Sequence, residues 1–301
     1  MDFTPNSTRY NLPSDAVWFI TGCSSGIGQG IAKYVTAHPT YRLVATARKT
    51  AALDAIADGP RVLKVALDVT SQSSVDAAVA AAVDRFGRLD VVINNAGYSL
   101  WGDTEAATEE QERRQIETLF WGTVRVSKHA VRVMRDENPK SGGRQGGIIL
   151  NVTSMGGFLA VPGGAFYHAG KFAVEGFTEA FAKEVRPEWN INFCIIEPGG
   201  VSTNFTGSSM DVCQGHPAYL KDAPARLLEQ YMMSSGTASG WSDIGLIAKA
   251  IDKLVTSGDR IPIRLPLGSD SYGAIVHEVE LVKKDLEDFK ELSNSTIPTS
   301  K

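Results

Sequence analysis

A doubly wound α/β protein, with one parallel sheet covered by helices on both faces, is predicted for this chain. Short runs of Val, Ile and Leu alternate with longer helical stretches between residues 16 and 200. These runs are apolar throughout, as strands buried on both faces are. The length of 301 residues allows one large domain or two smaller ones.

Six segments have the composition of buried strands: 16–21, 43–47, 62–67, 89–94, 147–153 and 191–197. Four segments between them carry apolar residues at intervals of three and four, which is helical spacing: 27–37, 73–86, 109–135 and 165–184. Parallel strands joined by helices use right-handed crossovers. The elements are therefore expected to form one sheet.

The remaining segments interrupt this alternation. Residues 1–13 are expected to form an N-terminal tail, and 14–301 a single domain. Within it, 199–240 has weak periodicity and is predicted to be a lid over a substrate site. A surface loop (138–147), a helix (242–257), an edge strand (260–267) and a charged amphipathic helix (271–292) complete the chain.

Composition and charge exclude several classes of function. The chain has 30 Lys and Arg against 34 Asp and Glu, so its net charge of −4 gives no basic footprint for nucleic acid. No signal peptide and no apolar stretch of membrane-spanning length is found. The three cysteines and five histidines lack metal-ligand spacing. We expect a cytoplasmic protein without a metal site.

A glycine-rich turn follows the first predicted strand, and its residues are Gly22, Ser24, Ser25, Gly26, Ile27 and Gly28. The first glycine permits a tight turn, the second lets a pyrophosphate approach the backbone, and the third lets the helix pack on the strand. Free N–H groups at the start of the helix would then face the anion. Glycine-rich turns also serve merely to reverse the chain, so the surrounding motifs must decide whether this turn binds a phosphate.

The ends of the second and third strands bear on which dinucleotide binds. An acidic residue after the second strand suits NAD, whereas Arg accommodates the 2′-phosphate of NADP. The chain has Arg48 there, which favours NADP(H), although a solvated strand-end charge is the alternative. Asp68, which ends the third strand, either hydrogen-bonds the adenine or begins a turn with Thr70.

Tyr167 and Lys171 are spaced i and i+4, so they lie on one face of a predicted helix. A nearby ammonium would favour the phenolate and lower the pKa of the tyrosine. Ser154 ends a predicted parallel strand, where active sites of such sheets form. Taken singly, such residues are more often a packed ring and a solvated charge.

In combination these motifs resemble the short-chain dehydrogenase/reductase family. The resemblance rests on Thr21-Gly22-x-x-x-Gly26-Ile27-Gly28, Asn94-Asn95-Ala96-Gly97, Ser154, Tyr167-x-x-x-Lys171 and Pro198-Gly199-Gly200-Val201-Ser202-Thr203, in the family's order. It covers residues 14–265 and implies a single Rossmann-type domain. Pro162-Gly163-Gly164 and Glu197-Pro198-Gly199-Gly200 look most similar to the hydroxysteroid- and retinol-dehydrogenase-like branch.

The resemblance implies hydride transfer between NADP(H) and a carbonyl or secondary alcohol. Tyr167 would donate a proton to the carbonyl oxygen, Ser154 would hydrogen-bond that oxygen, and Lys171 would hold the nicotinamide ribose. The other cofactor contacts implied are, on the adenosine side, Asp68, Val69, Asn95, Ala96 and Gly97 and, at the nicotinamide end, Pro198, Gly199, Val201 and Thr203.

One residue departs from the family pattern. Where the family usually has an Asn whose local helix distortion positions a water for the catalytic Lys, this chain has Leu119. Its side chain cannot hydrogen-bond water, although a backbone carbonyl can. The departure keeps open a non-redox cyclisation or isomerisation, and a non-catalytic NADP(H) sensor is an alternative from another class.

A small-molecule partner of moderately large, apolar character is expected, such as a polyketide, terpenoid or steroid-like metabolite. Apolar candidates for its pocket are Phe158, Leu159, Phe205, Met210, Tyr219, Met232, Met233 and Trp241. Small residues along 165–184 would let another helix approach. We therefore expect a homodimer or homotetramer in which 109–135 and 165–184 meet their copies.

Overall fold

In the computed structural model, residues 4–142, 144–203, 209–234 and 241–297 are described. Seven parallel strands form the main sheet, in the order β3-β2-β1-β4-β6-β7-β9. The strands are β1 (Val17–Ile20), β2 (Arg42–Ala47), β3 (Val62–Ala66), β4 (Val91–Asn94), β6 (Gly147–Val152), β7 (Ile191–Pro198) and β9 (Arg264–Leu267). This confirms the predicted doubly wound fold, including the edge strand.

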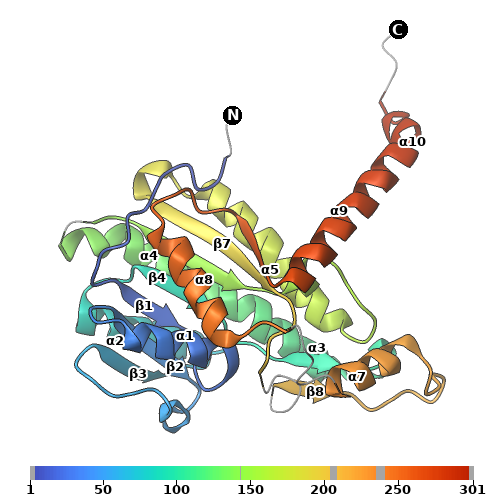
Figure 1. The fold of residues 1–301 in the computed structure, drawn as a ribbon, viewed down its shortest axis with the longest axis horizontal. Coiled ribbons are helices and arrows are strands. Elements are labelled where there is room, and N and C mark those ends of the chain that lie inside the picture. Colours follow the sequence, from blue (N-terminus) through green and yellow to red (C-terminus); the bar gives the residue numbers. More distant parts are fainter. Residues whose placement is uncertain (1–3, 143, 204–208, 235–240, 298–301) are drawn as a thin grey trace.

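Helices cover both faces of the sheet (Figure 1). Against one face lie α1 (Gly26–Ala37) and α8 (Ile244–Thr256), and against the other α2 (Gln72–Phe86), α4 (Gly122–Asp136) and α5 (Ala165–Glu184). The expected helix over 109–135 is divided into α3 (Glu109–Ile116), a π-helical turn (Glu117–Trp121) and α4.

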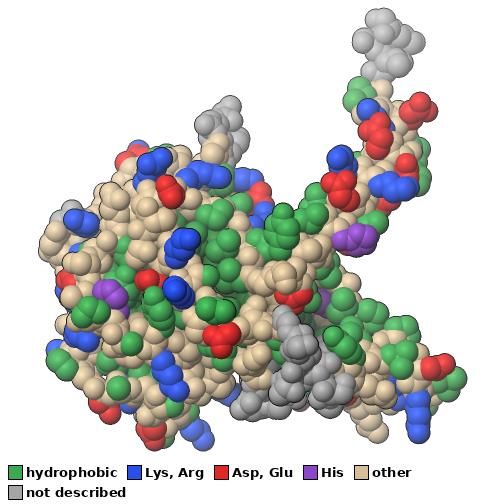
Figure 2. Space-filling model, in the orientation of Figure 1, with side chains coloured by type: hydrophobic (Ala, Val, Ile, Leu, Met, Phe, Trp, Pro, Cys, Tyr) green, Lys and Arg blue, Asp and Glu red, His purple; other side chains and the backbone are tan. Residues whose placement is uncertain are grey.

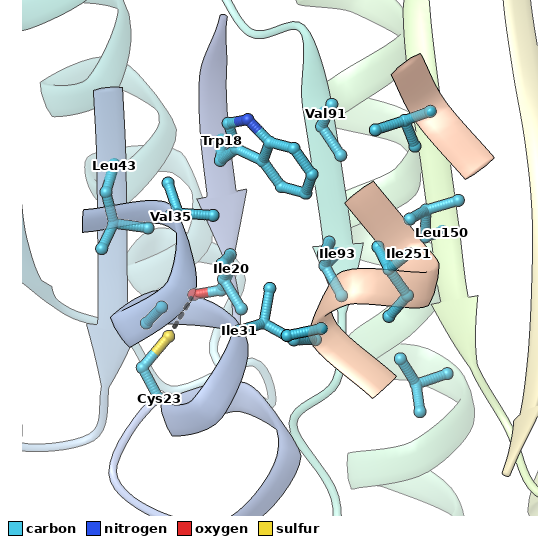
Figure 3. Packing of buried hydrophobic residues seen from close by; sticks show 14 of the residues in the cluster. Trp18, Ile20, Cys23, Ile31, Val35, Leu43, Val91, Ile93, Leu150 and Ile251 are labelled. Carbon is cyan, nitrogen blue, oxygen red and sulfur yellow. Dashed lines mark hydrogen bonds between the residues drawn. The ribbon is translucent and has the colours of Figure 1, made fainter. Parts of the chain in front are cut away.

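Two apolar clusters fill the space between the sheet and its helices. Figure 3 shows the first, in which Trp18 and Ile93 of the sheet meet Ile31 of α1 and Ile251 of α8, all 1% exposed or less. The second lies on the other face and includes Phe19 and Phe193. Because both faces are covered, the strands are apolar without alternation, as the sequence predicted.

The register of the sheet brings the ends of β1, β4, β6 and β7 to one edge. Ile20 pairs with Ile93, Asn94 with Asn151, and Val152 with Ile196. In a parallel sheet the loops after these strands therefore emerge side by side. The glycine-rich turn, the Asn95 loop, Ser154 and the Gly199 loop are those loops.

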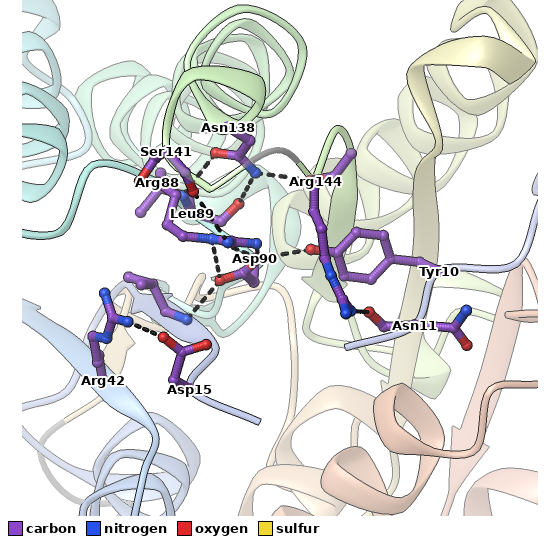
Figure 4. Close-up of polar contacts among 12 residues, drawn as sticks. Tyr10, Asn11, Asp15, Arg42, Arg88, Leu89, Asp90, Asn138, Ser141 and Arg144 are labelled. Carbon is purple, nitrogen blue, oxygen red and sulfur yellow. Dashed lines mark hydrogen bonds and ion pairs between the residues drawn. The ribbon is translucent and has the colours of Figure 1, made fainter. Parts of the chain in front are cut away.

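The N-terminal segment, expected as a tail, is packed into the domain from residue 6 onward. Asn6 is buried, and its amide donates to the carbonyls of Phe193 (2.7 Å) and Ile261 (2.9 Å). The hydroxyl of Tyr10 donates to Asp90 at 2.6 Å, beside Arg88 (Figure 4). Nothing in the local sequence pattern of this segment signals these long-range contacts.

The expected lid, 199–240, has structure of its own in its described part. β8 (Met210–Val212) pairs in parallel with β5 (Ser99–Trp101), and α7 (Pro224–Ser234) follows. Residues 204–208 and 235–240 lie outside the described residues. The chain then continues through α8 and β9 to α9 (Ser269–Asp288) and α10 (Lys290–Asn294), which stand out from the body (Figure 1).

Candidate active site

Close packing explains the glycines of the turn after β1. Gly22 has φ +73°, and a Cβ there would lie 2.8 Å from the Cα of Ala96. A Cβ at Gly28 would lie 2.4 Å from the carbonyl oxygen of Gly22. Larger residues at either position would therefore push the turn away from its neighbours.

The same turn has the features of an anion site. Gly26 has φ +56°, and the nearest atom to its missing Cβ is the methyl group of Thr203 at 3.8 Å, an ordinary contact distance. Ser25 caps α1 in extended conformation without a side-chain hydrogen bond to the helix. First-turn N–H groups are thus available to a phosphate, and this arrangement fits a dinucleotide pyrophosphate.

Hydrogen bonds hold the Asn95 loop against this turn. The N–H groups of Asn95 and Ala96 both donate to the hydroxyl of Thr21 at 2.9 Å. The side-chain amide of Asn95 donates to the carbonyls of Thr21 (3.0 Å) and Gly22 (3.2 Å). Gly97 follows and is exposed at the same edge. Thr21 is a positioning residue whose role the sequence pattern alone did not assign.

The residues expected to contact the adenosine half of the cofactor lie at the ends of β2 and β3. Arg48 is exposed directly after β2. Asp68 accepts hydrogen bonds from the N–H (2.9 Å) and hydroxyl (2.7 Å) of Thr70, so the turn interpretation of this residue is realised. Val69 is buried beside Gly122.

The loop after β7 forms the opposite end of the site. The N–H of Gly200 donates to Asp270 at 2.7 Å, and a Cβ at Gly199 would collide with the same carboxylate. Val201 is buried and bridges to Ser242. Pro198 ends β7, and Thr203 lies beside Gly26. Asp270 shapes this loop from 70 residues away, which sequence spacing could not reveal.

Ser154, Tyr167 and Lys171 meet at the carboxyl edge between these two ends. The Ser154 hydroxyl accepts from the N–H of Gly156 at 3.1 Å and hydrogen-bonds Tyr167. The ammonium nitrogen of Lys171 lies 5.6 Å from the centroid of the Tyr167 ring. It donates to the carbonyl of Val152 at 2.8 Å, which fixes its place below the ring.

Burial dominates the electrostatics of this trio. It lowers the pKa of Lys171 to about 8, and the carboxylate of Glu175 acts in the opposite direction. Burial also raises the pKa of Tyr167, against a lowering hydrogen bond from Ser154. The expectation of a lowered tyrosine pKa was wrong because the loss of solvent outweighs the hydrogen bond from Ser154. A protonated phenol is suited to donate a proton.

The π-helical turn at 117–121 contains Leu119, the residue that departs from the family pattern. Its side chain fills the space between the Asn95 loop and α5: a Cβ at Gly97 would lie 2.7 Å from it, and one at Gly170 would lie 3.0 Å from it. Its carbonyl accepts from the Thr123 hydroxyl at 2.7 Å. The helix distortion is therefore present although the Asn is absent.

His168 positions the loop that follows Ser154. Its Nε2 accepts from the N–H of Val161 at 3.1 Å, which leaves Nδ1–H to donate to the carbonyl of Gly156 at 2.8 Å. Burial lowers the pKa of His168, so the neutral ring that this pattern requires is favoured. Sequence spacing does not reveal this role, because the hydrogen-bond partners of His168 are brought together only by folding.

The apolar pocket candidates are divided among several loops. Met210 is buried, Tyr219 is exposed, and Phe158, Leu159 and Trp241 are partly buried. Phe205 and the side chains of Met232 and Met233 lie outside the described residues.

Metal clusters and membrane-spanning helices are both absent from the described residues. No group of three or more His, Cys, Asp or Glu residues there is arranged to hold a metal ion. No described helix is long and apolar enough to cross a bilayer.

Known proteins resemble this chain in sequence and fold. A family model for short chain dehydrogenase matches residues 16–212. The oxidoreductase calM of Penicillium decumbens is 46% identical over 293 residues, which cover 96% of this chain and 95% of that protein. The 3-ketodihydrosphingosine reductase of Bacteroides thetaiotaomicron is 39% identical over 187 residues, 62% of this chain and 64% of that one.

Among solved structures, a short-chain dehydrogenase from Streptomyces avermitilis has a TM-score of 0.81 and 31% identity, covering 94% of this chain and all of that one. The sheet order, the glycine-rich turn and the matches to whole relatives agree. They identify an oxidoreductase with the fold that binds a nicotinamide cofactor. This chain belongs to the short-chain dehydrogenase/reductase family.

Proposed function

We propose that the protein is an NADPH-dependent oxidoreductase that transfers hydride between the nicotinamide and a carbonyl or secondary alcohol. The observation that carries this proposal is the meeting of Ser154, Tyr167 and Lys171 at the edge where the glycine-rich turn opens. Bound NADPH would supply the hydride; the chain itself has to orient the carbonyl and provide a proton.

Each of the three residues has a distinct task in this proposal. Tyr167, whose pKa is raised, holds the proton that passes to the carbonyl oxygen during reduction. Ser154 is hydrogen-bonded to that phenol and can donate to the same substrate oxygen. Lys171, fixed on the Val152 carbonyl, presents its remaining N–H groups to the ribose and stabilises the phenolate that is left.

Arg48 supports the preference for NADPH. Its guanidinium is exposed at the end of β2, where the 2′-position of the adenosine ribose lies in dinucleotide folds. Arg binds phosphate bidentately, whereas a carboxylate in this place would repel it. We also propose that the cofactor contacts the glycine-rich turn, Asp68, Val69, the Asn95 loop and the Pro198–Thr203 loop.

We propose a moderately large apolar substrate, of the polyketide, terpenoid or steroid-like kind. The apolar side chains of Phe158, Leu159 and Met210 support this class. The relative from Bacteroides thetaiotaomicron is named a 3-ketodihydrosphingosine reductase, which supports a ketone as the substrate.

The proposal also includes a cytoplasmic homodimer or homotetramer formed through α4 and α5. Trp121, in the π-helical turn before α4, and Phe172 on α5 are 47% and 44% exposed, and the space beside Gly176 is open. Large apolar side chains with small neighbours suit a helix–helix interface.

The test follows NADPH and NADH oxidation with a panel of apolar ketones and aldehydes. We expect turnover with NADPH, its loss to below about 1% in Tyr167→Phe, and undiminished NADPH binding in that variant. Full turnover in Tyr167→Phe would overturn the assignment of the proton donor. NADPH binding without oxidation across the panel would favour the non-redox enzyme or the sensor.

Cofactor choice is tested separately with Arg48→Ala, with Lys49→Ala as the matched control. Loss of a charge-assisted phosphate contact is expected to lower kcat/KM for NADPH about 10- to 100-fold and to leave NADH unaffected. Equal effects of the two substitutions would refute the role of Arg48.

A further inference from the structure

The C-terminal helix α9 carries an apolar stripe that the described body of the protein does not cover. The helix leaves the body beside the end of β7, where Ser271 donates to the carbonyl of Glu197 at 2.7 Å (Figure 1). Beyond this base it projects outward, with hydrophobic and charged side chains interspersed along its length (Figure 2). Apolar surface of this kind on a projecting helix usually marks an interface.

The stripe has the spacing of a coiled coil. Apolar residues alternate at intervals of three and four, which are positions a and d of a seven-residue repeat. They are Tyr272, Ile275, Val279, Val282, Leu286 and Phe289, the last at the end of α9. Ile275 is covered by the body, whereas Val282, Leu286 and Phe289 are 49%, 68% and 58% exposed.

We propose that α9 pairs with α9 of a second copy of this chain in a parallel two-stranded coiled coil. The charges beside the stripe favour this occupant. Glu278 and Asp285 occupy the g positions, and the e positions of the same repeat fall on Lys283 and on Lys290, the first residue of α10. In a parallel pair each g residue faces the e residue five positions on. Glu278 then meets the partner's Lys283, and Asp285 meets the partner's Lys290.

Other arrangements of the same helix are opposed by charge. An antiparallel pair brings e against e and g against g, which sets Lys against Lys and acid against acid. A lipid surface is disfavoured because residues 278–291 contain three Lys and six Asp or Glu, and helices that bind anionic membranes are basic.

The lysines also have contacts within their own chain. Lys283 lies 3.7 Å from Glu280, and Lys290 lies 3.4 Å from Glu287. Both pairs are well exposed, and such pairs hold side chains only weakly. The lysines are therefore able to turn toward a partner helix.

Pairing of α9 also bears on the active site. Asp270, in the first turn of α9, accepts from the N–H of Gly200 in the loop proposed to contact the nicotinamide. Because α9 is anchored at that loop, a coiled coil would place the corresponding loops of the two copies on the same side of the assembly. The contact is separate from the one proposed for α4 and α5, so it adds a second interface.

The test exchanges the charges beside the stripe. We expect Glu278→Lys with Asp285→Lys, and separately Lys283→Glu with Lys290→Glu, to weaken the α9 contact about 100-fold, because each variant repels its own copy. Sedimentation would then show an assembly half the size of the wild type. An equimolar mixture of the two variants is expected to restore the full assembly, because the α9 helix of one variant then carries charges opposite to those of the other.

Glu280→Lys with Glu287→Lys is the matched control, since it makes the same change of charge at b positions away from the seam. It is expected to leave the assembly intact. The direction of pairing is tested with Leu286→Cys, which in a parallel pair lies opposite itself and is expected to form a disulfide between copies under mild oxidation.

Several results would overturn the proposal. They are an assembly unchanged by either charge variant, an effect of the b-position control equal to theirs, a mixture that fails to reassociate, or no disulfide in Leu286→Cys. Binding of the wild type to phosphatidylcholine–phosphatidylserine vesicles, lost in Leu286→Asp, would replace the coiled coil by a membrane contact. These readouts are independent of hydride transfer, so the proposed function is neither supported nor damaged by them.

Discussion

Glu175→Gln is expected to lower the pKa of Lys171 by about one unit. The two residues are one turn apart on α5, and the carboxylate of Glu175 raises the pKa of the lysine while burial lowers it to about 8. Glu175 is buried, where it accepts from Thr153 at 3.2 Å and pairs with Arg264 at 3.2 Å. Its carboxylate thus lies against the loop that follows Ser154, where a Cβ at Gly157 would lie 2.4 Å from it.

The magnitude follows from the separation and the partner. Side chains one turn apart lie about 6 Å from each other, and unit charges at that distance interact by about 2.8 kcal/mol at an effective dielectric constant of about 20. That energy equals about two pKa units. Arg264 neutralises part of the carboxylate, which leaves about one unit. Removing the negative charge makes the ammonium easier to deprotonate, so the pKa falls.

The assay is the pH profile of kcat/KM for ketone reduction between about pH 6 and pH 10. Because burial raises the pKa of Tyr167 above its usual value near 10, Tyr167 does not account for a loss of activity near pH 8. Burial brings the pKa of both Lys171 and Glu197 to about 8. Of the two, only Lys171 loses the positive charge proposed to hold the ribose and the phenolate, so we assign the loss of activity nearest pH 8 to Lys171. We expect the midpoint of that loss to fall by about one unit in Glu175→Gln, with activity at lower pH largely kept.

Glu179→Gln is the matched control. Glu179 also pairs with Arg264, at 3.0 Å, but it lies two turns from Lys171 and its side chain is partly exposed. Its substitution is expected to leave the midpoint in place. The reasoning would be refuted by an unmoved midpoint in Glu175→Gln, by a shift to higher pH, or by an equal shift in the control.

Three further predictions concern stability and the site. Asp90→Asn leaves the buried Arg88 without its counter-ion and is expected to lower the free energy of unfolding by about 3–5 kcal/mol in urea titrations; a loss under 1 kcal/mol would contradict this. His168→Phe removes both ring hydrogen bonds to the loop that follows Ser154. It is expected to lower kcat about tenfold with little change in the Kd for NADPH. An unchanged kcat would show that Ser154 keeps its position without these hydrogen bonds. Leu119→Asn buries a polar amide in place of a packed leucine and is expected to lower the free energy of unfolding by about 2–4 kcal/mol. Because the helix distortion is already present, kcat is expected to change less than about threefold. A tenfold gain in kcat would show that the missing amide limits turnover.

The sequence was sufficient for the sheet and for the place of the site. Buried parallel strands must be apolar on both faces, so six of the seven strands stand out as continuous apolar runs, and Arg264–Leu267 was found at the edge in spite of Pro266. The glycine-rich turn, Ser154 and the Tyr167–Lys171 pair are local motifs. Once the strands are known to be parallel, these motifs necessarily emerge at one edge of the sheet.

Other features depend on partners far apart in the chain. The burial of Asn6 and Tyr10 requires β7 and Asp90, and the loop at Gly200 is held by Asp270. The small sheet of β5 and β8 was not predicted, because its two strands are three residues each and pair across more than 100 positions. Short strands carry too few residues for a periodic signal.

The sequence by itself determined which chemical groups this protein brings to a dinucleotide fold, because strand composition and motif spacing are local properties. Only the tertiary structure decided how those groups behave. The pKa of Tyr167 depends on how much solvent folding removes, and the fit of Leu119 against Gly97 and Gly170 brings together three segments far apart in the chain. Burial and close packing are sums over contacts from the whole chain, so no local pattern contains them.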